Sequence, residues 1–158
     1  MSKNVGKLFE EDFIASVPED VFKFRFRDLP YFLTKNSKYT VNNNPADFFI
    51  FYDYLYILEL KSCKGTSYPM TNTRKNQVEG LTKYSKCDKV LAGFVINYRK
   101  YNKTYFIHID DYIIISKHKK SINIKDMELY GKLIEQNLKR VRCSYNIKKF
   151  LNYKEDRC

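Results

Sequence analysis

Asp47, Glu59 and Lys61 are the residues of this chain best suited to do chemistry together. Two apolar, aromatic-rich runs flank a turn signal at Asp53, a pattern that predicts a hairpin of two strands. Side chains alternate between the faces of a strand, so Glu59 and Lys61 must share one face. Such a hairpin can bring Asp47, where the first strand begins, beside Glu59. Two carboxylates make an oxygen-rich site for a divalent ion, and a nearby lysine can hold or help to activate water or phosphate.

The second strand of this hairpin is expected to be largely buried, because Leu58 and Leu60 occupy its other face. A strand this apolar has few structural reasons to carry an acid and a base side by side, which favours a catalytic role for Glu59 and Lys61. The alternative is an ion pair that only satisfies both charges. The Glu-X-Lys spacing also occurs by chance on exposed strands, so the pattern alone is moderately specific.

Charge is distributed unevenly along the 158 residues, whose formal net charge is +11. Residues 1–60 hold 7 Lys and Arg against 9 Asp and Glu, whereas residues 61–158 hold 22 against 9. The second part, at +13, therefore carries the basic surface. An excess of this size favours a polyanion such as nucleic acid, because each phosphate contact releases condensed counterions. The alternative is the solvated surface of a lysine-rich protein.

Helices are predicted where apolar residues recur at helical spacing. The expected helices are residues 5–17, a segment capped by Thr71 or Asn72 that carries Gln77, a short helix from Asp110 to Ile115, and Asp126 to Asn152. Glu10, Glu11 and Asp12 are consecutive on the first helix, so they cannot all face the core. One of them could lean toward Asp47, or all three could form a solvated face.

Strands are predicted beside the hairpin as well. Residues 22–27 alternate Phe with Lys or Arg, which indicates a half-buried strand with one basic face, and residues 92–98 and 104–108 have the apolar character of central strands. The order of helices and strands predicts an α/β (α+β) fold in which helices flank a mixed central sheet, with residues 1–158 as a single domain.

Neither the cysteines nor the apolar runs suggest a different class of protein. Cys63, Cys87, Cys143 and Cys158 show no CxxC pair, which favours reduced thiols in a cytoplasmic protein over a zinc site. The longest aliphatic run, Ile113–Ile115, is far too short to cross a bilayer, so we expect no membrane partner.

Several short motifs occur in one order along the chain: Asn4–Glu10, Ala46–Phe48, Glu59–Lys61, Gly65–Met70 and Asn76–Gln77. In this order and spacing the chain resembles the RecU-type Holliday-junction resolvases of the PD-(D/E)XK nuclease superfamily. The similarity runs to about residue 108 and continues more weakly around residues 119–122. The stretch Thr66–Pro69 is the most specific part, because the general nuclease motif does not predict it.

The resemblance implies a restriction-endonuclease-like fold and a homodimeric, magnesium-dependent endonuclease that nicks four-way DNA junctions in symmetrically related strands. Mn²⁺ is expected to substitute for Mg²⁺, and the protein to work in the cytoplasm of a bacterial cell or a phage-infected host. Whether one or two ions bind stays open.

Roles follow from the resemblance position by position. Asp47, Glu59 and the Leu60 carbonyl would ligate the metal, and Glu10 would complete or support that site. Lys61 would orient or activate the attacking water, and Gln77 would assist from the following helix. The implied DNA contacts are Lys35, Lys38, Lys64, Thr66, Ser67, Arg74 and Lys75.

The chain departs from the family pattern in features that bear on DNA selection. The segment between Phe32 and Asn44 is short where the family carries a longer basic projection, and the family's basic N-terminal tail is missing. Two other functions therefore stand beside junction resolution. One is a nuclease for flaps or duplex ends, and the other is a DNA-binding protein that kept the fold without catalysis. The presence of Asp47, Glu59 and Lys61 argues against the second.

Overall fold

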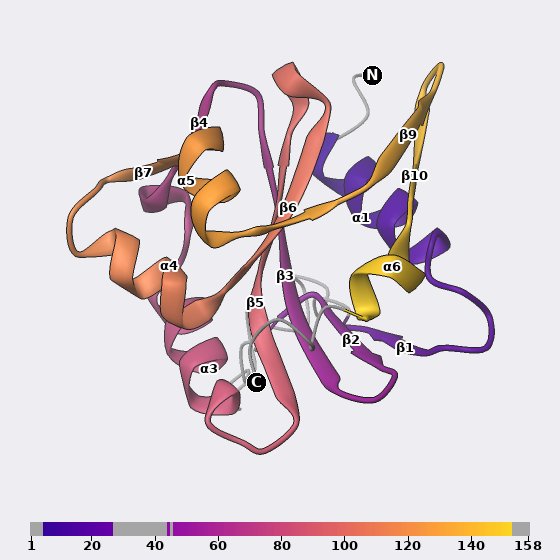
Figure 1. Cartoon of the computed structure of the whole chain (residues 1–158), viewed down its shortest axis with the longest axis horizontal. Coiled ribbons are helices and arrows are strands. Elements are labelled where there is room, and N and C mark those ends of the chain that lie inside the picture. The colour runs from indigo at the N-terminus through magenta and orange to yellow at the C-terminus, as the bar shows by residue number, and fades with distance from the viewer. Residues whose placement is uncertain (1–4, 27–43, 45, 153–158) are drawn as a thin grey trace, which may run out of the picture.

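The computed structural model of the chain describes residues 5–26, 44 and 46–152 (Figure 1). Its α-helices are α1 (Val5–Ala15), α3 (Lys75–Ser85), α4 (Ile109–Ser116), α5 (Ile124–Tyr130) and α6 (Ile147–Leu151), with 3-10 turns η1 (Met70–Asn72) and η2 (Arg99–Tyr101). Its strands are β1 (Phe22–Arg25), β2 (Phe48–Phe51), β3 (Leu55–Cys63), β4 (Ser67–Pro69), β5 (Val90–Tyr98), β6 (Lys103–His108), β7 (Ser121–Asn123), β8 (Lys132–Ile134), β9 (Gln136–Lys139) and β10 (Arg142–Tyr145).

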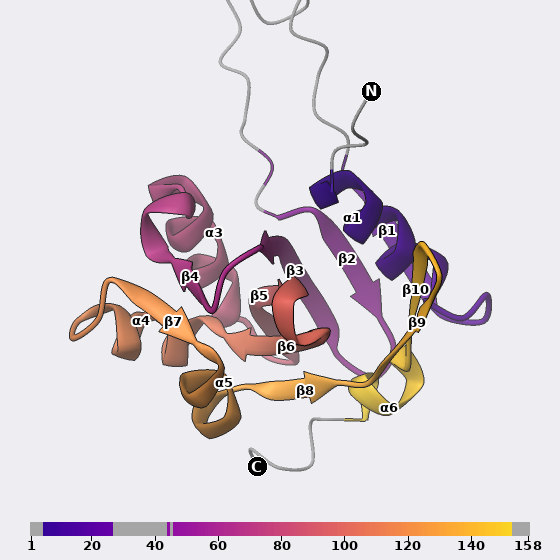
Figure 2. The ribbon, with the colours of Figure 1, turned by 90° about the horizontal axis from the view of Figure 1, so that it is seen from above.

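The centre of the fold is a mixed sheet with strand order β1-β2-β3-β5-β6-β8. β3 and β5 run parallel, and the other neighbouring pairs are antiparallel. Two small two-stranded sheets, β4 with β7 and β9 with β10, lie beside it. Figure 2 shows α3 and α4 on one side of the sheet and α1 on the other. The predicted α/β architecture with a mixed central sheet flanked by helices is confirmed.

A hydrophobic core fills each face of the sheet. Phe13 of α1 and Phe150 of α6 pack with Leu58 on one face. Leu81 of α3 and Ile109 of α4 pack on the other. Because alternate residues of β3 serve opposite faces, Glu59 and Lys61 lie on the α3 side. The predicted central positions of β5 and β6 are confirmed by the strand order.

The predicted hairpin is present as β2 and β3, which pair antiparallel from Phe48 with Leu58 to Phe51 with Leu55. Asp47 comes one residue before Phe48, and Glu59 comes one residue after Leu58, so both flank the Phe48–Leu58 pair. The register therefore places the two carboxylates at one position on the sheet. Glu59 is only 4% exposed, as the apolar strand around it predicted.

Residues 22–25 form the predicted strand, but its predicted burial is wrong. Phe22 and Phe24 are 61% and 52% exposed. β1 is the edge strand of the sheet, and it pairs only with β2 among the described residues. Alternation along the sequence gave the strand correctly, but whether a second layer covers the apolar side depends on tertiary structure.

The single long helix predicted from Asp126 to Asn152 is also wrong. α5 ends at Tyr130, and β8, β9 and β10 follow before the short α6. Gly131 ends α5 at a close approach, because a Cβ there would lie 2.8 Å from the Met127 carbonyl oxygen and 2.9 Å from that of Phe106. Leu138 and Val141, which completed the helical spacing, are 55% and 76% exposed.

The start of α3 differs from prediction by two or three residues. Thr71 and Asn72 belong to η1, and the residue before the helix is Arg74. The Arg74 backbone N–H donates to the Gln77 side-chain oxygen at 3.0 Å. The third helical residue thus caps the helix in place of a preceding hydroxyl or amide.

The described part of the chain has no helix long and apolar enough to span a bilayer. Its cysteines, Cys63, Cys87 and Cys143, are free thiols.

Candidate active site

Asp47 is held by the hairpin through both its backbone and its side chain. Its backbone N–H donates to the Leu58 carbonyl at 3.1 Å, and its Oδ2 accepts from the Leu60 N–H at 2.7 Å. The Asp47 carboxylate therefore adds a hydrogen bond to the β2–β3 hairpin next to the Phe48–Leu58 pair. Its position is fixed by the sheet rather than by a free choice of rotamer.

Lys61 and Gln77 converge on the carboxylate of Glu59. Lys61 Nζ donates to Glu59 Oε1 at 2.8 Å and to Gln77 Oε1 at 3.1 Å. Gln77 Nε2 also donates to Glu59 Oε1. The amide of Gln77 thus touches both charged groups, and its oxygen additionally receives the Arg74 N–H that begins α3. Gln77 thus connects the start of α3 to the Lys61–Glu59 pair on β3.

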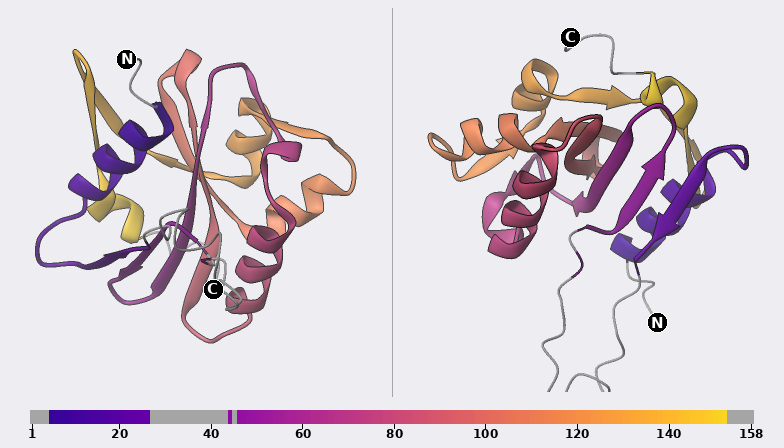
Figure 3. Two further views of the ribbon diagram at one scale, coloured as in Figure 1. Left: turned by 180° about the vertical axis from the view of Figure 1, so that it is seen from behind. Right: turned by 90° about the horizontal axis from the view of Figure 1, so that it is seen from below.

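These groups line a cleft of about 590 Å³. The left panel of Figure 3 shows, from behind, α3 and the β2–β3 hairpin, which carry most of these groups. The walls of the cleft are Lys7, Glu10, Arg25, Phe26, Asn44, Ala46, Asp47, Glu59, Leu60, Lys61, Asn72, Arg74, Asn76 and Gln77. Phosphate-sized polar ligands fit this lining better than apolar ones do, because most of it is charged or amide-bearing.

The three consecutive acids of α1 have different surroundings. Glu10 lines the cleft and forms an ion pair with Arg25. Asp12 is 7% exposed, accepts from the Cys143 N–H at 2.8 Å and is paired with Arg142. Glu11 lies 3.7 Å from Arg142. The interpretation of all three as a solvated face is therefore wrong, since Glu10 faces the cleft and Asp12 joins α1 to β10.

Two acids of the cleft, Asp47 and Glu59, have a raised pKa. Burial, followed by the charge of Glu59, raises the pKa of Asp47 from its usual 3.8 to about 7. Burial also raises the pKa of Glu59, and the neighbouring ammonium of Lys61 opposes that rise. The charge of Glu10 acts on both groups in the same upward direction. Ionising Asp47 and Glu59 together is therefore unfavourable in the folded protein.

The raised pKa of Asp47 predicts a pH-dependent gain in stability for Asp47→Asn. A carboxyl whose pKa is higher in the folded state favours folding most at acidic pH, and that contribution is lost as pH rises from about 4 through about 7. Each pKa unit corresponds to about 1.4 kcal/mol, so the metal-free variant should exceed wild type by about 1–3 kcal/mol at pH 8. The difference should become small near pH 4.

Urea unfolding in EDTA at both pH values measures this effect. Glu79→Gln, which neutralises an exposed acid paired with Lys75 on α3, serves as the control and should show no such gain. Equal stability of wild type and Asp47→Asn at pH 8 would contradict the electrostatic account.

The donor set of the site fits a hard divalent cation. Hydrogen bonds from described residues fall on Asp47 Oδ2 and Glu59 Oε1, so the second oxygen of each carboxylate can serve as a ligand. Magnesium takes one or two protein carboxylates, keeps several waters and binds substrate phosphate. Among the residues that the structure describes, no three His, Cys, Asp or Glu side chains cluster as a complete protein cage. An ion here would be held by few side chains and by its substrate.

The residues predicted to contact DNA are placed differently from one another. Arg74 lines the cleft, while Lys75 is exposed on α3 and paired with Glu79. Lys64 and Thr66 are exposed on the turn after β3, and Ser67 begins β4. Lys35 and Lys38 lie outside the described residues.

The sequence interpretation missed several residues that line the cleft. Lys7 and Asn76 lie within the motifs that carry the family resemblance, so their positions were available as a signal. Arg25 belongs to the basic face that the alternation of residues 22–27 predicted. Nothing in the sequence pairs Arg25 with Glu10, because that contact depends on how β1 lies against α1.

Comparison with known proteins adds an independent result. The profile of the family "RecU: Recombination protein U" matches residues 27–154, which is most of the chain. The chain belongs to the RecU family. The matched region contains Asp47, Glu59, Lys61 and Gln77, and it begins after Glu10.

Relatives of the RecU chain were found by sequence and by fold. It is 29% identical over 168 residues to the SPbeta prophage-derived uncharacterized protein YotM of Bacillus subtilis (strain 168), covering 94% of this chain and 85% of that protein. Its fold is similar to that of Archaeoglobus fulgidus Hjc, a Holliday junction resolvase from an archaeal hyperthermophile. That match has a TM-score of 0.50 at 13% identity and covers 80% of this chain and 87% of Hjc. The fold is thus restriction-endonuclease-like, as the resemblance implied.

Proposed function

We propose that this RecU-family protein is a magnesium-dependent endodeoxyribonuclease that resolves Holliday junctions by paired nicks during DNA recombination and repair. The observation that carries the proposal is the cleft in which Asp47, Glu59, Lys61 and Gln77 meet, on the fold of a junction resolvase. Family membership supports a role in recombination. The +13 charge of residues 61–158 supports a polyanionic substrate.

In this proposal Asp47, Glu59 and the Leu60 carbonyl hold Mg²⁺, with Glu10 supporting the site from α1, and Mn²⁺ can take its place. When bound, the ion supplies Lewis-acid stabilisation of the charge that develops on the phosphate oxygens. Lys61 stands beside Glu59 and can orient a water molecule for attack on phosphorus. Gln77 holds the Lys61 ammonium in place through its side-chain oxygen.

Lys61 and Glu59 form an ion pair, as they also would if the pair only satisfied its own charges. A pair that served stability alone would satisfy its charges within the pair. Here a second carboxylate stands beside it with a pKa raised to about 7, and both acids line an open cleft. Two carboxylates held this close and largely buried cost stability, which is characteristic of a cation-binding catalytic site.

We further propose that the protein acts as a homodimer and that residues 1–158 form one nuclease domain. Two symmetric nicks in a four-way junction require two active sites that act together, and a two-fold dimer supplies them. Sedimentation equilibrium of the protein with and without junction DNA measures its oligomeric state. A protein that remained monomeric on the junction would contradict the proposed symmetry.

The test of function is cleavage of three substrates of matched sequence: a four-way junction, a 5′ flap and a linear duplex. With Mg²⁺ or Mn²⁺ we expect paired nicks in the junction and at least tenfold slower cutting of the other two. Equal cleavage of all three would favour a nuclease for other DNA. Binding with no cleavage in either metal would favour a protein that kept the fold without catalysis.

A further inference from the structure

Three turns at one end of the central sheet carry exposed cations. β3 and β5 are parallel and end together at Cys63 and Tyr98, so Lys64 and Arg99 leave the sheet side by side. The third turn is that of the β9–β10 hairpin. Figure 1 shows the three turns along the upper edge of the molecule, at the β3–β4 connection, at η2 and at the tip of β9–β10.

The β9–β10 hairpin is attached to the middle turn. Gln136 Nε2 donates to Asn102 Oδ1 at 2.5 Å, and Gln136 Oε1 accepts from Thr104. A groove of about 210 Å³ runs between the two turns, with Arg99 and Asn102 on one wall and Leu138 and Val141 on the other. The hairpin therefore has a defined place next to η2.

We call the exposed cations of these turns the basic rim: Lys64, Arg99, Lys100, Lys139 and Arg140. No ion pair within the described residues involves any of the five. Elsewhere on the described surface some cations are paired with an acid, as Lys75 is with Glu79 and Lys103 is with Glu128, and others, such as Lys83, are not. The rim thus carries positive charge that its own fold does not neutralise, which is what a phosphate backbone requires.

Helix α1 connects the rim to the catalytic cleft. Lys7 and Glu10 line the cleft, whereas Val5 and Leu8 of the same helix line the groove beside the hairpin. The catalytic strand leads in the same direction, since Lys64 follows Glu59 by five residues. At about 3.3 Å per residue the rim begins about 17 Å from the metal-binding carboxylates.

We propose that the basic rim binds the phosphate backbone of a DNA arm that leaves the catalytic cleft. This proposal rests on the proposed function and specifies where its substrate lies. With a base pair about every 3.4 Å, the contacted phosphates lie about five base pairs from the cut. Contacts to phosphate position a duplex and do not read its sequence, so the rim holds arms of any sequence.

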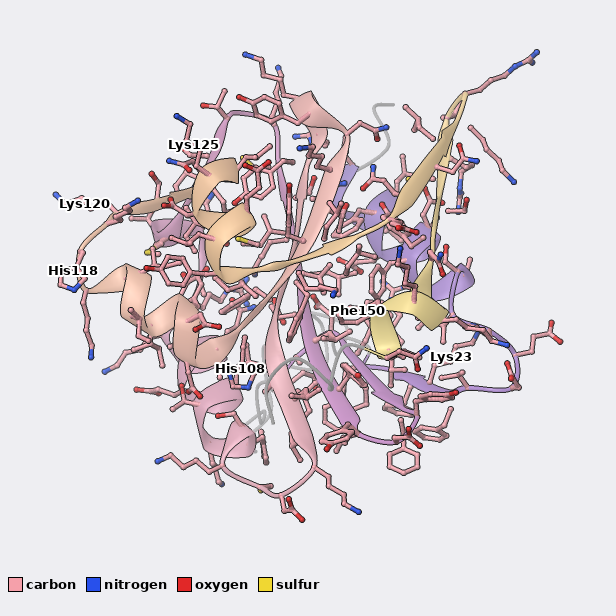
Figure 4. The ribbon with its side chains drawn as sticks, viewed as in Figure 1. Lys23, His108, His118, Lys120, Lys125 and Phe150 are labelled. Atoms are coloured by element: carbon pink, nitrogen blue, oxygen red, sulfur yellow. The ribbon has the colours of Figure 1, made fainter. Side chains whose placement is uncertain are left out.

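Other basic groups lie on other parts of the surface, away from the three turns. Figure 4 shows His118 and Lys120 pointing outward from the turn between α4 and β7, on the opposite side of the molecule from the β9–β10 hairpin. Lys83, Lys86 and Lys89 lie at the end of α3 and the turn before β5, which is the opposite end of the sheet from Tyr98. The last group offers a control of equal charge.

The test compares two triple variants that each remove three positive charges. The rim variant carries Lys64→Gln, Lys100→Gln and Arg140→Gln, and the control carries Lys83→Gln, Lys86→Gln and Lys89→Gln. Binding to a four-way junction is measured with Ca²⁺ in place of Mg²⁺, at 50 to 200 mM salt. We expect the rim variant to bind about tenfold more weakly at 100 mM salt, with a salt slope lower by about 2–3. The control should change less than twofold.

A chemical change in the DNA locates the contact. Neutral methylphosphonates replace the phosphates four to six nucleotides from the cut in one junction and twelve to fourteen in another. The nearer methylphosphonates should weaken junction binding by wild type. They should not weaken binding by the rim variant any further, because that variant already lacks the rim side chains that contact those phosphates. Equal weakening of rim and control variants, or equal methylphosphonate losses in wild type and rim variant, would overturn the proposal.

Binding and cleavage separate this proposal from the function on which it rests. If wild type cuts no DNA but the rim variant still binds more weakly than the control, the nuclease assignment fails and the rim stands. If wild type cuts junctions while both variants bind as it does, the rim fails alone. Thermal unfolding checks that each triple variant is folded. If the rim triple variant does not fold, the single variants Lys100→Gln and Arg140→Gln replace it, and each should bind the junction twofold to threefold more weakly than wild type.

Discussion

Replacing Glu59 by glutamine should reduce junction cleavage by about 10³-fold or more while leaving junction binding intact. The carboxylate is both a proposed metal ligand and the group to which Lys61 and Gln77 donate. Losing metal stabilisation of the developing charge costs about 4 kcal/mol, and each 1.4 kcal/mol is tenfold in rate. Asp47→Asn should have an effect of the same order. Single-turnover cleavage with saturating enzyme measures the chemical step directly.

Binding must be measured on the same variants, because a folded enzyme with a weakened site still holds its substrate. Removing a negative charge that faces phosphate should leave the junction Kd unchanged or lower it. The double variant should be little worse than either single, since the two carboxylates act as one site. Glu79→Gln on α3 is the matched control and should cut at the wild-type rate. Wild-type cleavage by both site variants would refute the site assignment.

The second large effect is expected on stability, at a distance from the cleft. Asp12→Ala should lower the free energy of unfolding by about 2–4 kcal/mol. The change leaves the partly buried Cys143 N–H without its acceptor and removes the nearer partner of Arg142, which is half-exposed. Urea unfolding at pH 7 measures it. Glu11→Ala, one residue away and only partly buried, should cost less than about 0.5 kcal/mol.

Asp12→Ala should also affect activity, because it loosens the helix that positions Glu10. α1 carries Glu10 into the cleft, and Asp12 anchors α1 to β10. A variant that is folded but loosened there should bind metal more weakly, which a titration of Mn²⁺ against cleavage rate detects. A loss of stability no larger than that of Glu11→Ala would show that the contact to β10 is not what holds the helix.

The hairpin could be predicted from the sequence because its determinants are local. Alternating side chains and a turn at Asp53 define the register, and the register places Asp47 beside Glu59. The contact between Gln77 and Lys61 could be predicted only by resemblance, since it depends on where α3 begins relative to β3. Charge counting indicated a basic second part but could not say that five of its cations gather on three turns at one end of the sheet.

The remaining errors have a common cause in partners that are distant in sequence. Asp12 is buried against a strand 131 residues later, and a pattern within one helix contains no sign of that strand. Phe22 and Phe24 alternate as in a covered strand, yet the cover depends on which element lies over the sheet edge. After Tyr130, apolar residues three and four apart are also consistent with short strands, and the close approach at Gly131 decides between them.

The parallel pairing of β3 with β5 has a consequence for when the enzyme becomes active. Gln77 lies on the helix that crosses between these strands, and that helix packs by Leu81 against a core that includes Phe94 of β5. A nascent chain that has not yet added β5 can form the Asp47–Glu59 hairpin but cannot seat Gln77 against Lys61. Non-local closure of this kind is a late event in folding. The proposed nuclease activity should therefore arise only in chains that have folded past the crossover.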